Sequence, residues 1–199
     1  MLAGVVLAEH TQVLLSMNDS PFNLVGILIE GASQPTLEND RCRFHRKSGF
    51  FIREQAGAHR AVYVCIANIE DGITVFEHAH PVLEAYQLIG NDRAGWAFSK
   101  QAQGTAQRKV IRGNAIGLML ENHSHPTRDH NQVMENKQVG IRIMDRARGE
   151  VRHNEIQHNV AHGIVIQGIA EPVLEDNHCV VESWGQHSVQ RSVKWNGPS

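Results

Sequence analysis

Residues 117–166 read GLMLENHSHPTRDHNQVMENKQVGIRIMDRARGEVRHNEIQHNVAHGIVI, and a glycine followed by a short apolar segment opens this stretch and returns twice within it. The same glycine recurs every 22 or 23 residues along the chain. Its positions are Gly4, Gly26, Gly49, Gly72, Gly95, Gly117, Gly140 and Gly163. A fixed period of this length is typical of repeat architectures, in which each unit stacks on its neighbours.

Each repeat unit holds three strand-like segments. The segment after the glycine is followed by a second one, such as EPVLED (171–176), and by a third one, such as EIQHN (155–159). Gly, Pro, Asn and Asp separate these segments, and no unit has the apolar spacing of three or four residues that a helix needs. The sequence therefore predicts an all-β parallel solenoid of about eight 22–23-residue coils, with three short strands per coil.

Counting each glycine as position 1 indicates which side chains enter the core. Positions 2 and 4 are apolar in every coil, and alternation along a strand sends both to the inward face. Position 8 is always small, which lets the coil turn tightly. Cys42, Cys65 and Cys179 share position 17 with Leu, Ile and Val, so we interpret them as free, buried thiols rather than nucleophiles or a disulfide framework.

Two columns of asparagine indicate hydrogen-bonded ladders. Asparagine tolerates left-handed backbone angles, and its amide can bond to the next coil. Position 20 holds Asn23, Asn68, Asn91, Asn114, Asn136 and Asn159, with His45 in the second coil. Position 15 holds Asn18, Asp40, Asn131, Asn154 and Asn177, but Tyr63, Tyr86 and Lys109 interrupt this second column. We expect a bulge or exposed aromatic side chains at the interruption.

A longer period of two coils is visible at position 10, which alternates between proline and glycine along much of the chain. The segments ASQPTLEND (32–40), QAQGTAQRK (101–109), RARGEVRHNEI (146–156) and AEPVLEDNHC (170–179) carry this alternation. In them the chain resembles right-handed parallel β-helix repeat proteins of the pectate-lyase-like superfold, which include bacterial β-helix repeat proteins and the β-helix segments of F-box proteins. The resemblance covers residues 4–185 and implies a right-handed β-helix. Its members include binding domains, substrate-recognition modules and polysaccharide enzymes, so it implies no single function.

The ends of the chain and its composition indicate its domain boundaries, its location and the partners it lacks. We predict one β-helix domain over residues 1–185 and a lid or tail over residues 186–199. The first coil begins close to Met1, so we expect an open end that further chain or end-to-end self-association would cover. The free cysteines and the lack of a signal peptide favour a cytoplasmic location. A net charge of −2 without a basic–aromatic patch argues against nucleic acid and membrane partners.

The outward face of the first strand is unusually apolar. Its stripe includes Phe51, Phe76 and Met119, with Arg142 among them. Because an exposed apolar stripe often marks an interaction surface, we predict these four residues to bind a partner. Lyases of the resembled superfold carry acidic calcium ligands and a basic residue on this face. Here the charged residues of the face lie on distant coils, so we predict no catalytic residue and no cofactor.

Histidines at one corner suggest a second binding surface. His78 and His80 occupy positions 7 and 9 of one coil, and His123 and His125 occupy the same positions two coils later. The two pairs are then roughly 9.6 Å apart, twice the strand spacing, so one metal ion cannot bridge them. Regularly spaced hydrogen-bonding groups of this kind would suit an extended sugar polymer or a peptide.

A further pair, His130 and His153, shares position 14 of neighbouring coils, and Asp176 takes that place in the next coil. These three residues are the candidates for a metal site. They are expected to lie in a line, however, whereas a tetrahedral site needs ligands that converge. We therefore predict a solvated polar ladder and no metal.

Together these features predict a non-catalytic β-helix scaffold that binds a protein or glycan partner on a lateral face. One alternative is a polysaccharide-active enzyme of the lyase, epimerase or hydrolase kind, based on the histidine corner. Another is a purely structural repeat, engineered or excised, that has no ligand of its own.

Overall fold

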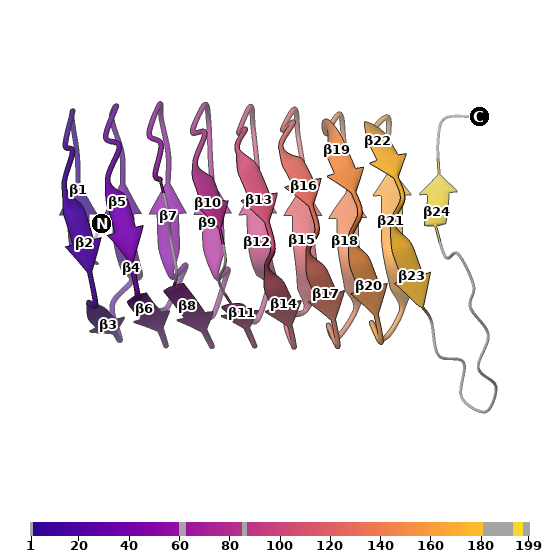
Figure 1. The fold of residues 1–199 in the computed structure, drawn as a ribbon, viewed down its shortest axis with the longest axis horizontal. Coiled ribbons are helices and arrows are strands. Elements are labelled where there is room, and N and C mark those ends of the chain that lie inside the picture. Colours follow the sequence, from indigo (N-terminus) through magenta and orange to yellow (C-terminus); the bar gives the residue numbers. More distant parts are fainter. Residues whose placement is uncertain (1, 60–62, 85–86, 181–192, 197–199) are drawn as a thin grey trace.

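The computed structural model of the chain describes residues 2–59, 63–84, 87–180 and 193–196, and it shows a column of stacked coils (Figure 1). Every pairing between its strands is parallel. The predicted all-β parallel solenoid is thereby confirmed. Among the described residues no helix has the length and apolar character needed to cross a membrane.

The strands stack into three lateral faces. The first face is a nine-stranded sheet of β1 (Ala3–Leu7), β4 (Val25–Ile29), β7 (Phe50–Ile52), β9 (Ile73–Val75), β12 (Ala94–Phe98), β15 (Ile116–Leu120), β18 (Val139–Ile143), β21 (His162–Gln167) and β24 (Val193–Asn196). The second face holds the pair β2 (Leu14–Ser16) and β5 (Thr36–Glu38), then the sheet of β10 (Val82–Glu84), β13 (Thr105–Gln107), β16 (Thr127–Asp129), β19 (Arg148–Arg152) and β22 (Glu171–Glu175). The third face is an eight-stranded sheet of β3 (Asp19–Pro21), β6 (Asp40–Arg43), β8 (Tyr63–Ile66), β11 (Gln87–Ile89), β14 (Val110–Arg112), β17 (Gln132–Met134), β20 (Glu155–Gln157) and β23 (His178–Val180).

The coil count follows from the first face. Its first eight strands, β1 to β21, are the eight glycine-led segments, and eight stacked strands are separated by seven complete turns. The prediction of about eight coils therefore counted segments rather than complete turns. Among the described residues each coil has three strands except the third, where a single bridge residue, His59, links Thr36 and Val82 on the second face.

The predicted core columns are confirmed. Position 2 and 4 side chains such as Phe50, Ile52, Trp96 and Phe98 are completely buried. The three position 17 cysteines are free and buried, as predicted. Burial, and then the neighbouring Cys65 thiol, raise the pKa of Cys42 well above its ordinary value, which keeps this thiol protonated and unreactive.

The recurring position must be glycine because the backbone of the next coil, a core side chain and a ladder amide all lie close to it. A Cβ on Gly117 would lie 2.4 Å from Val133 Cγ1, 2.5 Å from the Gly140 carbonyl oxygen and 2.9 Å from Asn136 Nδ2. The proline–glycine alternation at position 10 has a similar cause. Gly149 has a φ of +134°, and a Cβ there would lie 2.4 Å from the carbonyl oxygen of Pro126 in the coil before it.

The coils bend at three corners, and a residue with left-handed backbone angles stands at each corner that the structure describes. These residues occupy positions 6, 14 and 19, with Glu77, His130 and Phe44 as examples at φ values of 61°, 52° and 59°. We expected the ladder asparagines themselves to adopt these angles, and that was wrong for both ladder columns. The left-handed residue precedes the asparagine there, because it turns the chain so that the next side chain points back toward the corner.

The position 20 ladder is confirmed, and it runs through the buried side of the third corner. Asn91 donates its backbone N–H and its side-chain Nδ2–H to Asn114 Oδ1 at 2.9 and 2.8 Å. Asn114 donates in turn to Asn136 Oδ1 and, through Nδ2, to the Leu88 carbonyl at 3.0 Å. The Asn114 amide thus satisfies backbone groups of the preceding coil and of its own coil, and it is joined to the next coil through the Asn136 amide.

Replacing Asn114 by Ala should lower the free energy of unfolding by about 2–4 kcal/mol, because several buried donors and acceptors lose their partners together. Urea denaturation monitored by circular dichroism measures this loss. The matched control is Gln132→Ala on exposed strand surface, which should change stability by roughly 0.5 kcal/mol or less. Equal effects of the two substitutions would contradict the role of the ladder.

His45 replaces asparagine in the second coil of this ladder. Its Nδ1 accepts the backbone N–H of Asn23 at 3.1 Å, and its own backbone N–H donates to Asn68 Oδ1 at 3.1 Å. An Nδ1 acceptor requires the neutral ring with hydrogen on Nε2. Burial lowers the pKa of His45, against the opposing effect of the backbone groups around Asn23 and Ser20.

We expect His45→Asn to make the fold less sensitive to acid. Because the pKa of His45 is lower in the folded chain than its ordinary value of 6.5, unfolded chains bind a proton that folded chains exclude. The histidine therefore costs stability as the pH falls below about 6.5. The measurement is the difference in unfolding free energy between wild type and variant at pH 5 and pH 7.5. A difference that is the same at both pH values would be incompatible with this account.

At the interruption of the second ladder Lys109 is buried. The side chains of Tyr63 and Tyr86, the aromatic residues expected to be exposed, lie outside the described residues, so that expectation stays a prediction. Lys109 is 1% exposed, and its backbone N–H donates to Asn131 Oδ1 at 3.3 Å. Its Nζ donates to the Leu83 carbonyl and, at 2.8 Å, to the Gln107 carbonyl, so the amine takes the place of the ladder amide. Burial and the nearby Arg128 lower the pKa of Lys109 to about 6.

We expect Lys109→Met to abolish an increase in the free energy of unfolding with rising pH. Between a folded pKa of about 6 and the ordinary 10.5, folding releases the proton of Lys109. Wild-type stability should therefore increase relative to the variant by up to about 1.4 kcal/mol per pH unit between pH 7 and 9. Guanidinium denaturation of both chains across this range checks the relative slope. Parallel pH profiles would show that Lys109 stays charged in the folded protein.

The two ends of the column differ. The predicted lid or tail at residues 186–199 lies outside the described residues except at 193–196, where β24 pairs in parallel with β21. At the other end Leu2 and Leu14 are exposed, and end-to-end association through this coil stays a prediction.

Candidate functional site

The apolar stripe on the outer face of the first sheet is less exposed than we expected. Met119 is only 5% exposed, and with Ala94, Ala97 and Ile116 it forms a small buried cluster separate from the main core. This corrects the interpretation of Met119 as part of an exposed surface. The physical reason is the strand spacing of about 4.8 Å, at which stacked side chains cover one another and their smaller neighbours. Arg142 is half-buried beside Met119 in the sheet register.

The exposed part of the stripe is an aromatic pair. Phe51 and Phe76 are half-buried, and their ring centroids lie 6.0 Å apart at an interplanar angle of 41°. Lys100 Nζ lies 4.4 Å from the centroid of the Phe76 ring, a cation–π contact. The same ammonium lies 3.6 Å from Glu77 Oε1, so its charge is balanced locally.

A hollow of about 370 Å³ adjoins this pair at the first corner. Positions 6 and 7 of three successive coils line it, namely Glu77, His78, Lys100, Gln101, Asn122 and His123. The left-handed backbone at Glu77, Lys100 and Asn122 turns their side chains outward at the corner. The structure thus brings His78 and His123 to the same hollow, as the regular spacing predicted.

His80 and His125 do not line the hollow, although the sequence placed them in the same group. A buried small residue, Ala79 or Ser124, separates each from the preceding histidine. The Nδ1–H of His80 donates to the His78 carbonyl at 3.3 Å, and that of His125 donates to the His123 carbonyl at 3.2 Å. We use the term corner groove for Phe51, Phe76 and the six residues that line the hollow. His80 and His125 lie outside it.

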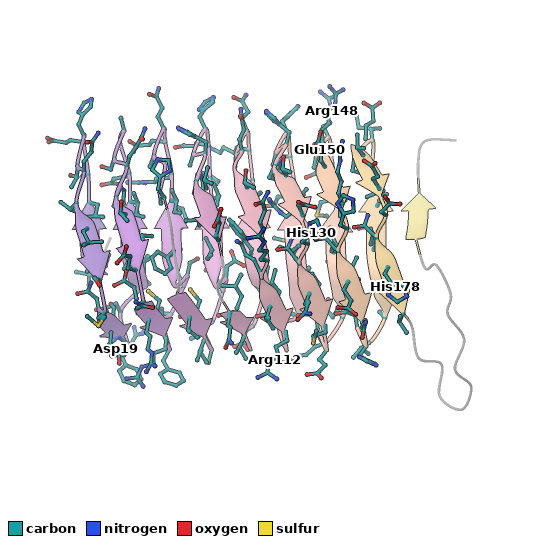
Figure 2. The ribbon with its side chains drawn as sticks, in the orientation of Figure 1. Asp19, Arg112, His130, Arg148, Glu150 and His178 are labelled. Carbon is teal, nitrogen blue, oxygen red and sulfur yellow. The ribbon has the colours of Figure 1, made fainter. Side chains whose placement is uncertain are left out.

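The corner continues along the column. A second hollow, of about 460 Å³, lies at the same positions of the first three coils, lined by Glu9, His10, Gly31, Ala32, Glu54 and Gln55. Both hollows are open and lined mainly by residues with polar side chains, and successive lining groups are spaced by one strand separation. Figure 2 shows how polar side chains such as Arg148 and Arg112 project outward at the corners of the column.

The chemistry that the corner groove can perform is limited by its carboxylates. Glu77 is the one carboxylate that lines the described hollow, and it is paired with Lys100. Glycoside hydrolysis usually needs two carboxylates roughly 5–10 Å apart. The groove instead offers amides, imidazoles and an aromatic pair, which are groups suited to hydrogen bonding and stacking.

The residues considered for a metal are brought together more closely than the sequence indicated. Asp129 Oδ1 lies 2.8 Å from His130 Nδ1 and 2.9 Å from His153 Nδ1, and His153 Nε2 lies 3.8 Å from Asp176 Oδ2. Burial raises the pKa of Asp129, but the hydrogen bonds from His153 and His130 outweigh it and hold the pKa below its usual value. Asp129 was missed because it belongs to position 13, a neighbouring column.

Sequence reasoning missed two further features. Phe22 and Phe44 stack in the open at the third corner, with ring centroids 5.5 Å apart and 75% and 43% exposure. Arg128 is completely buried in the core, its guanidinium 3.8 Å from the Phe98 ring centroid. The signal for both was a departure from the repeat: an aromatic residue at a corner, and a cation at position 12, which is apolar in six of the eight coils.

Comparison with known proteins agrees with this architecture. No curated protein matches the chain. A family model described as a right-handed β-helix region matches residues 3–190, nearly the whole sequence. The chain therefore belongs to the right-handed β-helix family.

Proposed function

We propose that this protein is a non-catalytic scaffold that binds an extended, uncharged polysaccharide along the corner groove. The observation that carries the proposal is the hollow lined by His78, Gln101 and His123 next to the Phe51–Phe76 pair. Sugar rings offer hydroxyl groups at their edges and apolar C–H faces, which suit polar side chains beside an aromatic ring.

The repeat supports an extended ligand rather than a compact one. Polar side chains recur at each coil, and the second hollow continues the same positions toward the amino-terminal coil. A linear polymer could contact several coils at once, and the resulting multivalency would compensate for the shallow shape of each hollow.

The local charge favours an uncharged polymer over a polyanion. The Lys100 ammonium is held between Glu77 and the Phe76 ring, so it presents little net positive potential to a ligand. The chain as a whole carries a net charge of −2, which also gives no general attraction for polyanions.

The test is affinity electrophoresis and calorimetry with uncharged polysaccharides such as xylan, β-glucan and galactomannan, with pectate and alginate as anionic comparisons. Saturable binding to an uncharged polymer is expected. Phe76→Ala and the double variant His78→Ala/His123→Ala should each weaken it by roughly tenfold or more, the loss of one or two good contacts.

The matched control is His80→Ala/His125→Ala, which changes the same residue type in the same coils outside the groove. It should bind as the wild type does. Equal losses in the two double variants, or no binding to any uncharged polymer, would overturn the proposal. Chromatography of the bound polymer for shortened or unsaturated products tests the enzyme alternative in the same samples, since a scaffold leaves the polymer unchanged.

A further inference from the structure

We propose that Asp129, His130, His153 and Asp176 form a zinc-binding site at the second corner of coils six to eight, independent of the corner groove. His130 is labelled in Figure 2. Positions 13 and 14 supply these residues, whereas the groove uses positions 3, 5, 6 and 7. The inference therefore goes beyond the proposed polysaccharide binding.

Asp129 fixes the tautomer of the two histidines. Asp129 Oδ1 lies within hydrogen-bonding distance of Nδ1 in both rings, at 2.8 Å for His130 and 2.9 Å for His153. A carboxylate only accepts, so both Nδ1 atoms carry hydrogen, and the neutral rings keep a free lone pair on Nε2. A carboxylate that orients the far nitrogen in this way is the usual second shell of a zinc-bound histidine.

The second step concerns convergence. The two rings stack with centroids 4.8 Å apart and an interplanar angle of 24°, and both direct Nδ1 at the same oxygen. Asp129, His130 and His153 each offer one ligand atom within 4.8 Å of one another. His153 Nε2 is also 3.8 Å from Asp176 Oδ2. Tetrahedral zinc with bonds of about 2.0–2.1 Å places its ligand atoms roughly 3.4 Å apart, so the exposed rings must rotate out of the stacked arrangement for both to reach one ion.

The third step concerns access and charge. His130 and Asp176 are 61% and 74% exposed in their side chains, which gives a metal ion and its water ligands direct access. Arg152, which is next to Asp129 in the sheet register, is bound by Glu175 at 3.1 Å and by Glu150 at 3.4 Å. Its charge is thereby largely neutralised beside the site.

Two imidazoles and one carboxylate, with water in the fourth place, form a ligand set that suits Zn²⁺ rather than Ca²⁺ or Mg²⁺, which prefer oxygen. The linear arrangement expected from the sequence considered only position 14. Asp129 from the neighbouring column holds the two rings close together, so that a single ion can reach both once they rotate.

The experiment is isothermal titration calorimetry of the full chain with ZnCl₂ in a non-chelating buffer. One saturable zinc per chain is expected in addition to any weak binding. His130→Ala/His153→Ala should remove this site, Asp176→Asn should weaken it at least tenfold, and Asp129→Asn should weaken it roughly 10–100-fold through loss of orientation. CaCl₂ should show no saturable binding.

The control is His178→Ala, which removes an exposed histidine from β23 and should leave the zinc isotherm unchanged. Zinc should also raise the melting temperature of wild type but not of the double variant. If the double variant does not fold, the single variant His130→Ala takes its place. Zinc isotherms that coincide for wild type and the histidine variants would overturn the proposal, and this result would leave polysaccharide binding unaffected.

Discussion

The structure depends on the hydrogen bonds of the buried ladder amides. At a tight corner of a stacked coil, backbone N–H and carbonyl groups turn away from the sheets and would otherwise lose their partners in a dry interior. Asn114 and Asn136 satisfy these groups and simultaneously join one coil to the next. The same requirement explains the recurring glycine, since the ladder amide approaches the backbone so closely that a side chain such as one on Gly117 has no room.

The corners carry a conformational cost that the ladders and the sheets offset. Left-handed backbone angles cost roughly 1–2 kcal/mol for residues other than glycine, and they recur at three corners of the coils. Bulky residues such as Phe22 and Phe44 accept this conformation because the sheets and ladders on both sides fix it. The corner side chains consequently project outward. The candidate binding groups of the corner groove and of the zinc site lie at these corners or next to them.

The departures from the repeat are the informative positions. His45 and Lys109 occupy ladder positions with titratable groups. His45 must stay neutral for its Nδ1 to accept as an amide oxygen would, whereas Lys109 donates through Nζ, and burial favours its neutral form. Arg128 replaces an apolar side chain in the core beside Phe98. On the surface, at the groove and at the proposed zinc site, histidines occupy positions that hold other residue types in other coils. A regular scaffold places such substitutions one or two strand spacings apart, and a cluster of like groups then becomes a site.

Much of the fold could be predicted from the sequence because the interactions that specify it are local to one period. The glycine at position 1, the apolar residues at positions 2 and 4 and the asparagines at position 20 determined the parallel β-helix and its core. Only the tertiary structure decided how side chains from different columns pack against one another. The burial of Met119 and Lys109, the separation of His80 from the hollow and the alignment of His130 with His153 by Asp129 all depend on how side chains of neighbouring positions fill the same space. A column in the sequence gives the order of residues along one corner, whereas exposure and convergence are set by packing across corners, which no single column contains.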